Sequence, residues 1–147
     1  MSRSPILLLV DDNSIYLQLL TMFAKKRGYP YVTAVDGKLA IEAFVKAHKE
    51  SLFSSETDAP VATERLSSVG LPNVILMDIN MPVMDGYEAV QRIRTYETKH
   101  NVVPARIIAV TALQSEAAHV EAVGSGFNMF LNKPLQLKSL VKIIEGS

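Results

Sequence analysis

The sequence contains no cysteine, so the chain can form no disulfide framework and offers no thiolate ligand to a metal. It also lacks an excess of charge, because 15 basic residues balance 15 acidic ones. This balance argues against a general nucleic-acid or membrane surface. No apolar run is long enough to cross a bilayer, and Asp11-Asp12 interrupts the first apolar run too early for a signal peptide. These absences predict a cytoplasmic location, with a nuclear one also compatible.

The length of 147 residues and the hydrophobic content of 48% predict a single domain over 1–147 with one sizeable core. One stretch, Lys49–Asn73, does not fit a compact repeat, since it is rich in Ser, Thr, Glu and Asp and carries two prolines and a glycine. Connections of this length are uncommon in compact domains. We therefore expect an insertion at about 49–73, either a solvated loop with no role or a partner-specific contact.

The most informative stretch is Val74–Gly86, where four apolar residues run directly into Asp78. A continuous apolar run that does not alternate indicates a strand buried on both faces of a parallel sheet. Pro82 cannot donate to a sheet ladder, so the strand ends before it. Asp85 and Glu88 have capping-box spacing, which predicts a helix from about Gly86. Asp78 should therefore lie at the carboxyl end of the strand, where open α/β sheets bind ligands.

Three other predicted strands also run into polar residues. Asp11 and Asp12 follow the apolar run 6–10, Thr111 follows the run 107–110, and Lys133 comes shortly after the weaker strand 127–131. If the strands are parallel, these side chains and Asp78 gather at one edge of one sheet. Taken singly, Thr111 and Lys133 would be ordinary strand-end and surface residues. Together, the three carboxylates, the hydroxyl and the amine predict a functional site.

Helical patterns separate the predicted strands. On the first helix, from Asn13 or Ser14 to Gly28, one face is predicted to carry Ile15, Leu19, Met22 and Phe23, with the last three taken as its buried part. The other helices are predicted to begin at Lys38, Gly86, Ser115 and Leu135, and the remaining strand to span Tyr31–Val35. Five strands and five helices in strict alternation predict a single doubly wound α/β domain, with a parallel sheet covered by helices on both sides.

The predicted site favours phosphoryl chemistry. Like charges on Asp11, Asp12 and Asp78 disfavour joint ionisation unless a cation neutralises them. Because the available ligands are oxygens, the expected cation is a hard divalent ion, and we expect Mg²⁺. Lys133 can pair with a phosphoryl oxygen, and Thr111 can donate a hydrogen bond to one. Such a site suits a carboxylate that accepts a phosphoryl group and becomes an aspartyl phosphate.

Four fragments in this order resemble the receiver domains of two-component response regulators, and most closely those of hybrid histidine kinases. The fragments are L-V-D-D-N, M-D-I-N-M-P-V-M-D-G-Y-E-A, V-T-A-L and F-L-N-K-P-L. The resemblance covers nearly the whole chain and implies the flavodoxin-like strand order 2-1-3-4-5. It also implies a phosphorylation switch for signal transduction rather than a separate enzyme. Both a single-domain regulator and a piece of a hybrid kinase fit the sequence.

The resemblance assigns a role to each residue of the predicted site. It implies that Asp78 is the phosphoacceptor and that Asp12, Asp78 and the backbone carbonyl of Asn80 hold Mg²⁺. Asp11 would act on the ion through water. Thr111 and Lys133 would then bind the phosphoryl oxygens.

Three further features follow from the same resemblance. Phe130 would be a switch aromatic that turns inward, and the Lys133–Pro134 peptide would be cis. Ile15, at the start of the first helix, would contact a histidine-phosphotransfer protein. One departure is Tyr16, which stands where receivers of this kind commonly have asparagine, so a contact on the first helix could differ.

The expected partner is a histidine-phosphotransfer protein or a histidine kinase, without direct binding to nucleic acid or membrane. His48, His100 and His119 lie away from the predicted strand ends and are interpreted as surface residues, which leaves no obvious internal phosphoryl donor. One competing function is a magnesium phosphohydrolase, which would usually carry a second acid where Asn80 stands. Another is a flavin module, which would need a Ser/Thr-rich loop where the chain has Asp11 and Asp12.

Overall fold

The computed structural model describes residues 4–53, 70–112 and 124–145. It contains one five-stranded parallel sheet in the order β2-β1-β3-β4-β5, which confirms the predicted flavodoxin-like arrangement. The strands are β1 (Leu7–Val10), β2 (Tyr31–Ala34), β3 (Val74–Asp78), β4 (Arg106–Thr111) and β5 (Met129–Asn132). The helices are α1 (Ser14–Arg27), α2 (Gly37–Phe53), α3 (Gly86–Lys99) and α5 (Leu137–Glu145). Within these ranges, no helix has the length and apolar character needed to span a membrane.

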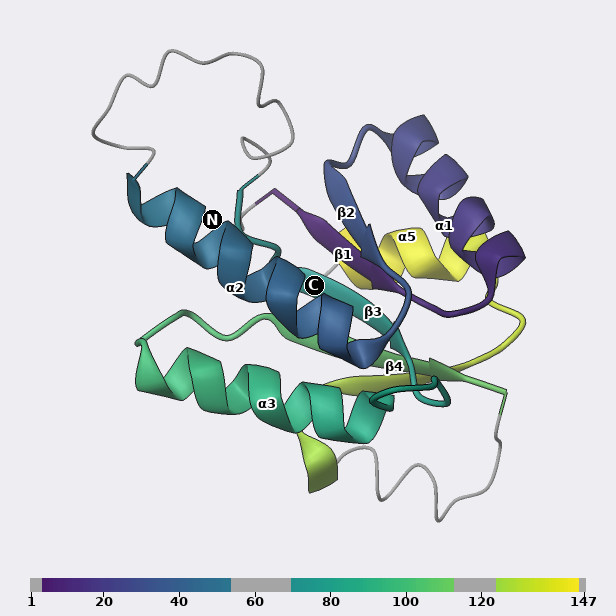
Figure 1. Cartoon of the computed structure of the whole chain (residues 1–147). Helices are drawn as coiled ribbons and strands as arrows, with labels where there is room; N and C mark the ends of the chain where they lie inside the picture. The colour runs from purple at the N-terminus through teal and green to yellow at the C-terminus, as the bar shows by residue number, and fades with distance from the viewer. Residues whose placement is uncertain (1–3, 54–69, 113–123, 146–147) are drawn as a thin grey trace.

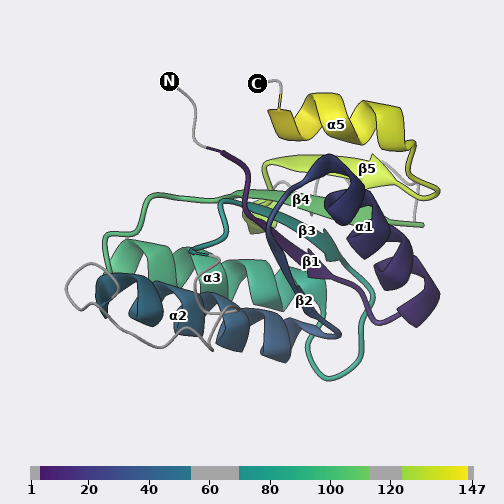
Figure 2. The same cartoon turned by 90° about the horizontal axis from the view of Figure 1, so that it is seen from above.

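The helices form two layers, one on each side of the sheet. α2 and α3 cover one face, and α1 and α5 cover the other (Figures 1 and 2). The hydrophobic core has one part on each side of the sheet, and strand β1 contributes alternate residues to the two parts. Leu8 and Val10 pack on the α2–α3 side, whereas Leu7 and Leu9 pack on the α1–α5 side. Burial on both faces explains why the strands read as continuous apolar runs.

The buried face of α1 differs from the predicted one. Phe23 is buried as expected, but Leu19 and Met22 are 39% and 61% exposed. Leu20 and Ala24 complete the buried face instead. Apolar residues occur on both sides of this helix, so the spacing fits two faces. The packing of α1 against β1 and α5 determines which of the two faces is buried.

Several predicted boundaries shift by a few residues. α2 continues to Phe53, inside the stretch predicted to be an insertion. At the other end of that stretch, the Asn73 side chain accepts a hydrogen bond from Ile6 N (2.9 Å) and donates one to Ser4 O (3.0 Å). The central part of the insertion and most of the helix predicted from Ser115 lie outside the described residues. β5 begins at Met129, two residues later than predicted.

Candidate functional site

The strand register brings the predicted site residues to one edge of the sheet. Val10 of β1 pairs with Met77 of β3, so Asp11 follows directly beside Asp78. Asp78 is the last residue of β3. Thr111 is the last residue of β4 and pairs with Asn132, the last residue of β5. Because all five strands are parallel, these carboxyl ends meet at the same edge.

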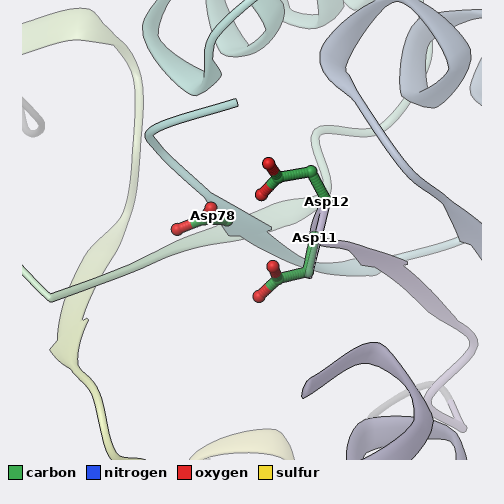
Figure 3. Close-up of side chains that lie close together, drawn as sticks. All are labelled: Asp11, Asp12 and Asp78. Carbon is green, nitrogen blue, oxygen red and sulfur yellow. The ribbon is translucent and has the colours of Figure 1, made fainter. Parts of the chain in front are cut away.

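The three aspartates form a compact cluster at this edge. One carboxylate oxygen from each of Asp11, Asp12 and Asp78 lies within 4.8 Å of the others. The side chains of Asp11 and Asp12 leave the end of β1 in different directions, but both carboxylates are turned toward Asp78 (Figure 3). Asp11 and Asp78 are buried and Asp12 is exposed. The cluster therefore offers carboxylate oxygens to a hard divalent cation, with one side open to solvent.

Lys133 provides positive charge between the two buried carboxylates. Its Nζ lies 2.9 Å from Asp11 Oδ2 and 3.7 Å from Asp78 Oδ1. The backbone of Lys133 is also fixed, because its N–H donates to the Thr111 carbonyl oxygen at 2.8 Å. The lysine is thus positioned by β4 and β5 and pairs more closely with Asp11 than with Asp78.

The electrostatics of the cluster leave negative charge incompletely compensated. Burial, together with the charge of Asp11, raises the pKa of Asp78 from its ordinary value of 3.8 to about 6, and Lys133 offsets this only in part. For Lys133, burial lowers the pKa, but the hydrogen bond with Asp11 and the charges of Asp78 and Asp11 outweigh it, so the net pKa is raised. Both shifts are those expected of a site that attracts further positive charge.

Local hydrogen bonds hold the loops around the cluster. Asn13 N donates to Asp11 Oδ1 (2.9 Å), and the Asn13 side chain caps α1 by accepting from Tyr16 N (2.9 Å). Asp85 caps α3 by accepting from Glu88 N (3.0 Å), as the sequence predicts. The two caps fix the starts of α1 and α3, the helices that follow Asp12 and Asp78.

The other predicted site residues lie near the cluster in different settings. Thr111 is fully buried at the end of β4. Asn80 is exposed two residues beyond Asp78, and Ile15 is 78% exposed in the first turn of α1. Phe130 is half-buried in β5, opposite Ala109, and packs on the α2–α3 side of the core.

The histidines differ partly from the prediction that all three lie on the surface. His100 is exposed, as expected. His48 is half-buried, and its Nδ1 lies 2.7 Å from the Tyr96 hydroxyl, between α2 and α3. His119 falls outside the described residues.

The Lys133–Pro134 peptide is cis, as predicted. The sequence did not predict that Tyr16 would contact this loop. Lys133 Nζ lies 4.4 Å from the centroid of the Tyr16 ring, and the Tyr16 hydroxyl accepts a hydrogen bond from Leu135 N at 2.9 Å. The only signal in the sequence was that Tyr16 stands where similar sequences commonly have asparagine. This departure indicated a different contact on the first helix, but not which residues Tyr16 would contact.

Comparison with known proteins matches residues 7–145 to the response regulator receiver domain family. The peroxide stress-activated histidine kinase mak1 of Schizosaccharomyces pombe is 30% identical, over 95% of this chain and 7% of that protein. Probable histidine kinase 2 of Oryza sativa subsp. japonica is also 30% identical, over 95% of this chain and 12% of that protein. The chain therefore spans a small part of the length of these relatives.

Two solved structures share the fold over most of both chains. The receiver domain of the histidine kinase CKI1 from Arabidopsis thaliana, complexed with Mg²⁺, has a TM-score of 0.76 and 31% identity, covering 97% of this chain and 93% of that one. The receiver domain of Ssk1 from Saccharomyces cerevisiae, crystallised with the histidine phosphotransfer protein Ypd1, has a TM-score of 0.72 and 28% identity, covering 98% and 89%.

Proposed function

This chain belongs to the response regulator receiver domain family, and on that premise we propose that Asp78 accepts a phosphoryl group from a phosphohistidine on another protein. The observation that carries the proposal is the cluster of Asp11, Asp12 and Asp78, whose oxygens lie within 4.8 Å, with Lys133 Nζ between the two buried acids. As a receiver domain of a two-component phosphorelay, the chain would act as a switch that promotes its own phosphorylation and dephosphorylation, rather than as an enzyme with a separate substrate.

The donor set at the cluster fits Mg²⁺. Its ligands are carboxylate oxygens, and burial together with the charge of Asp11 raises the pKa of Asp78, an effect that a bound cation would oppose. Asp12, Asp78 and the backbone carbonyl of Asn80 would hold the ion directly, and Asp11 would hold it through water. When bound, Mg²⁺ supplies positive charge that neutralises phosphoryl oxygens. The Mg²⁺ complex of the similar CKI1 receiver supports Mg²⁺ as the ion.

The residues of the chain account for the transfer step. A carboxylate oxygen of Asp78 attacks phosphorus, a P–O bond forms, and the P–N bond to the donor histidine breaks. The imidazole, which carries a proton on its other ring nitrogen, leaves with the bonding electron pair as neutral histidine. Lys133 pairs with one phosphoryl oxygen, and the Thr111 hydroxyl donates to another. Phe130, half-buried beside Ala109, would turn further inward as Thr111 moves toward the phosphoryl group.

Labelling with a small phosphodonor tests the acceptor assignment. Incubated with Mg²⁺ and acetyl phosphate, the protein should gain one phosphoryl group by mass spectrometry, and Asp78→Asn should gain none because an amide is a poor nucleophile. The matched control is Asp85→Asn, since asparagine caps helices as well as aspartate and α3 should persist. Equal labelling of Asp78→Asn and the unchanged protein would remove Asp78 from its role.

Metal binding is tested without phosphorylation. Calorimetric titration of the unphosphorylated protein should show Mg²⁺ binding, and Asp12→Ala should weaken it because one carboxylate ligand is lost. Glu42→Ala, which changes an exposed acid on α2, should leave the affinity unchanged. An unchanged affinity in Asp12→Ala would contradict the assignment of this cluster as the metal site.

The proposed partner is a histidine-phosphotransfer protein or a histidine kinase that docks at the carboxyl edge of the sheet. Ile15 lies at this edge and is 78% exposed. Leu19 and Met22 continue the exposed apolar strip along α1 at helical spacing. The complex of the similar Ssk1 receiver with Ypd1 supports a partner of this kind. An apolar anchor can carry much of the binding energy of a small interface.

Ile15→Asp should therefore slow transfer from a phosphorylated histidine-phosphotransfer protein, by about tenfold or more, while labelling by acetyl phosphate stays nearly intact. Val103→Asp is the matched control, because Val103 is 63% exposed before β4, at the opposite edge of the sheet. If transfer and labelling fell together in Ile15→Asp, Ile15 would be a folding residue. If neither fell, docking would lie elsewhere.

Three coarser expectations also belong to the proposal. The sequence 1–147 would form one receiver domain, with an insertion at about 49–73 whose described ends are the last turns of α2 and the segment before β3. The protein would act in the cytoplasm. Its activity within any longer polypeptide would be that of the phosphoacceptor module.

A further inference from the structure

Tyr16 contacts the Lys133 loop at two points. It is the third residue of α1 and is half-buried. The Lys133 ammonium lies 4.4 Å from the centroid of its ring, and its hydroxyl accepts from Leu135 N at 2.9 Å. Proline has no N–H, so Leu135 carries the first backbone donor after Lys133. One side chain therefore holds both the charged end of Lys133 and the backbone just beyond it.

These contacts are part of a closed network of interactions that begins and ends at Asp11. Asp11 Oδ1 accepts from Asn13 N, and the Asn13 side chain accepts from Tyr16 N, both at 2.9 Å. The Tyr16 ring lies beside Lys133 Nζ, which returns to Asp11 Oδ2 at 2.9 Å. The position of the ring is thus fixed relative to the same acid that binds the lysine.

The Tyr16 ring can hold the Lys133 ammonium in a way that the carboxylates cannot. Lysine is a point charge on a flexible four-carbon stem. Its nearer carboxylate here is Asp11, at 2.9 Å, and not the proposed acceptor Asp78, at 3.7 Å. The attraction of a cation to an aromatic face does not depend on the charge of neighbouring acids. The ring can therefore hold the ammonium in place when a cation or a phosphoryl group changes the charge of the acids.

We propose that Tyr16 is a positioning residue that sets the rate of phosphoryl transfer by holding Lys133 over the acid cluster. This inference rests on the proposed function, in which Asp78 is the acceptor and Lys133 meets a phosphoryl oxygen. The aromatic face orients the ammonium, and the hydroxyl fixes the loop at Leu135. Tyr16 acts through Lys133 and does not touch the phosphoryl group.

Two substitutions separate the contributions of the ring and the hydroxyl. Tyr16→Phe keeps the ring and loses the bond to Leu135, whereas Tyr16→Leu loses both. With acetyl phosphate and Mg²⁺, the maximal labelling rate should fall about threefold in Tyr16→Phe and about tenfold in Tyr16→Leu. The half-saturating concentration of acetyl phosphate should change less than about twofold, because Tyr16 does not touch the phosphodonor.

A second measurement reports the contact itself. In protein carrying ¹³C-labelled lysine, the ε-methylene protons of Lys133 should resonate upfield because the Tyr16 ring lies against the ammonium. The signal should persist in Tyr16→Phe and move to the ordinary lysine position in Tyr16→Leu. Tyr31→Leu is the matched control, since Tyr31 of β2 packs on the same side of the core. It should change thermal stability without changing the labelling rate or the Lys133 signal.

The inference is overturned if Tyr16→Leu labels at the unchanged rate, if its Lys133 signal does not move, or if Tyr31→Leu slows labelling equally. Tyr16→Met serves the same purpose if Tyr16→Leu does not fold. Two further variants keep the proposed function distinct from this inference. Normal labelling of Asp78→Asn would refute the proposed function itself. Loss of labelling in Asp78→Asn and Lys133→Ala, with normal labelling in Tyr16→Leu, would refute only the role of Tyr16.

Discussion

Replacing Asp78 with asparagine should stabilise the folded protein at neutral pH when no divalent cation is present. Asp78 is buried beside Asp11, and its pKa is raised from 3.8 to about 6. The folded state therefore holds a proton on Asp78 at pH values where the unfolded chain has released it. Because the folded pKa of this acid is raised, its contribution to stability falls as the pH rises from about 4 to about 6.

The size of the effect follows from the same shift. The difference between 3.8 and about 6 is about two pH units. At 1.36 kcal/mol for each pH unit, the ionised carboxylate costs about 3 kcal/mol of unfolding free energy at pH 7. An asparagine side chain carries no charge and avoids this cost. The unfolding free energy of the variant should thus exceed that of the unchanged protein by about 3 kcal/mol at pH 7 and by almost nothing below about pH 4.

Urea unfolding followed by circular dichroism, from pH 4 to 7.5 with a chelator present, measures this difference. The exposed acid Glu42 provides the control, since Glu42→Gln should change the unfolding free energy by less than about 0.5 kcal/mol at every pH. Adding Mg²⁺ should narrow the gap by stabilising the unchanged protein, because the ion binds the folded state. A less stable Asp78→Asn at pH 7, or a gap independent of pH, would refute the electrostatic account of the site.

Three other substitutions probe the elements that support the site. Val83 is an exposed β-branched residue with φ of 69°, so Val83→Asn should stabilise the fold by about 1 kcal/mol by relieving backbone strain. A Cβ on Gly86 would lie 2.7 Å from the Asp78 carbonyl oxygen, so Gly86→Ala should cost about 1–3 kcal/mol by shifting the end of β3. The buried Glu97 carboxylate accepts from Ala105 N at 2.8 Å, and Glu97→Ala should cost about 3 kcal/mol.

Chemical denaturation measures all three changes, and each has its own point of failure. A neutral or destabilising Val83→Asn would mean that the loop does not store strain. Unchanged stability of Gly86→Ala would mean that α3 moves away from β3 at no cost. Glu88→Ala is the control for Glu97→Ala, because Glu88 pairs with Arg92 on the exposed surface. Its replacement should lower the unfolding free energy by less than about 1 kcal/mol. Equal losses at the two glutamates would contradict the role of burial.

The sequence predicts those parts of the site that depend on strand ends. An apolar run buried on both faces is visible without a structure, and the residue that ends it must lie at the edge of the sheet. Asp11, Asp78 and Thr111 were located in this way, and the structure brings them together. The flavodoxin-like order came from the resemblance alone, because alternating strands and helices do not determine which strand lies in the centre.

The parts that the sequence does not predict depend on packing between distant segments. The first helix carries apolar residues on two sides, and its packing against β1 and α5 selects Leu20 over Leu19 for the core. The bond from Leu135 N to Tyr16 joins residues 119 positions apart. The preference of Lys133 for Asp11 depends on side-chain distances that no spacing along the chain encodes.

The acid cluster lowers the stability of the folded protein, because the sheet holds its carboxylates close to one another. Val10 and Met77 are register partners in two neighbouring, hydrogen-bonded strands that are buried, so the acids that follow them are held close together. Their repulsion can be reduced by a proton, by Lys133 or by a bound cation. A proton on Asp78 would remove the proposed nucleophile, whereas a cation leaves the carboxylate ionised. The hydrophobic core thus supports an affinity for positive charge beside an ionised Asp78, and this is the property that a phosphoryl acceptor requires.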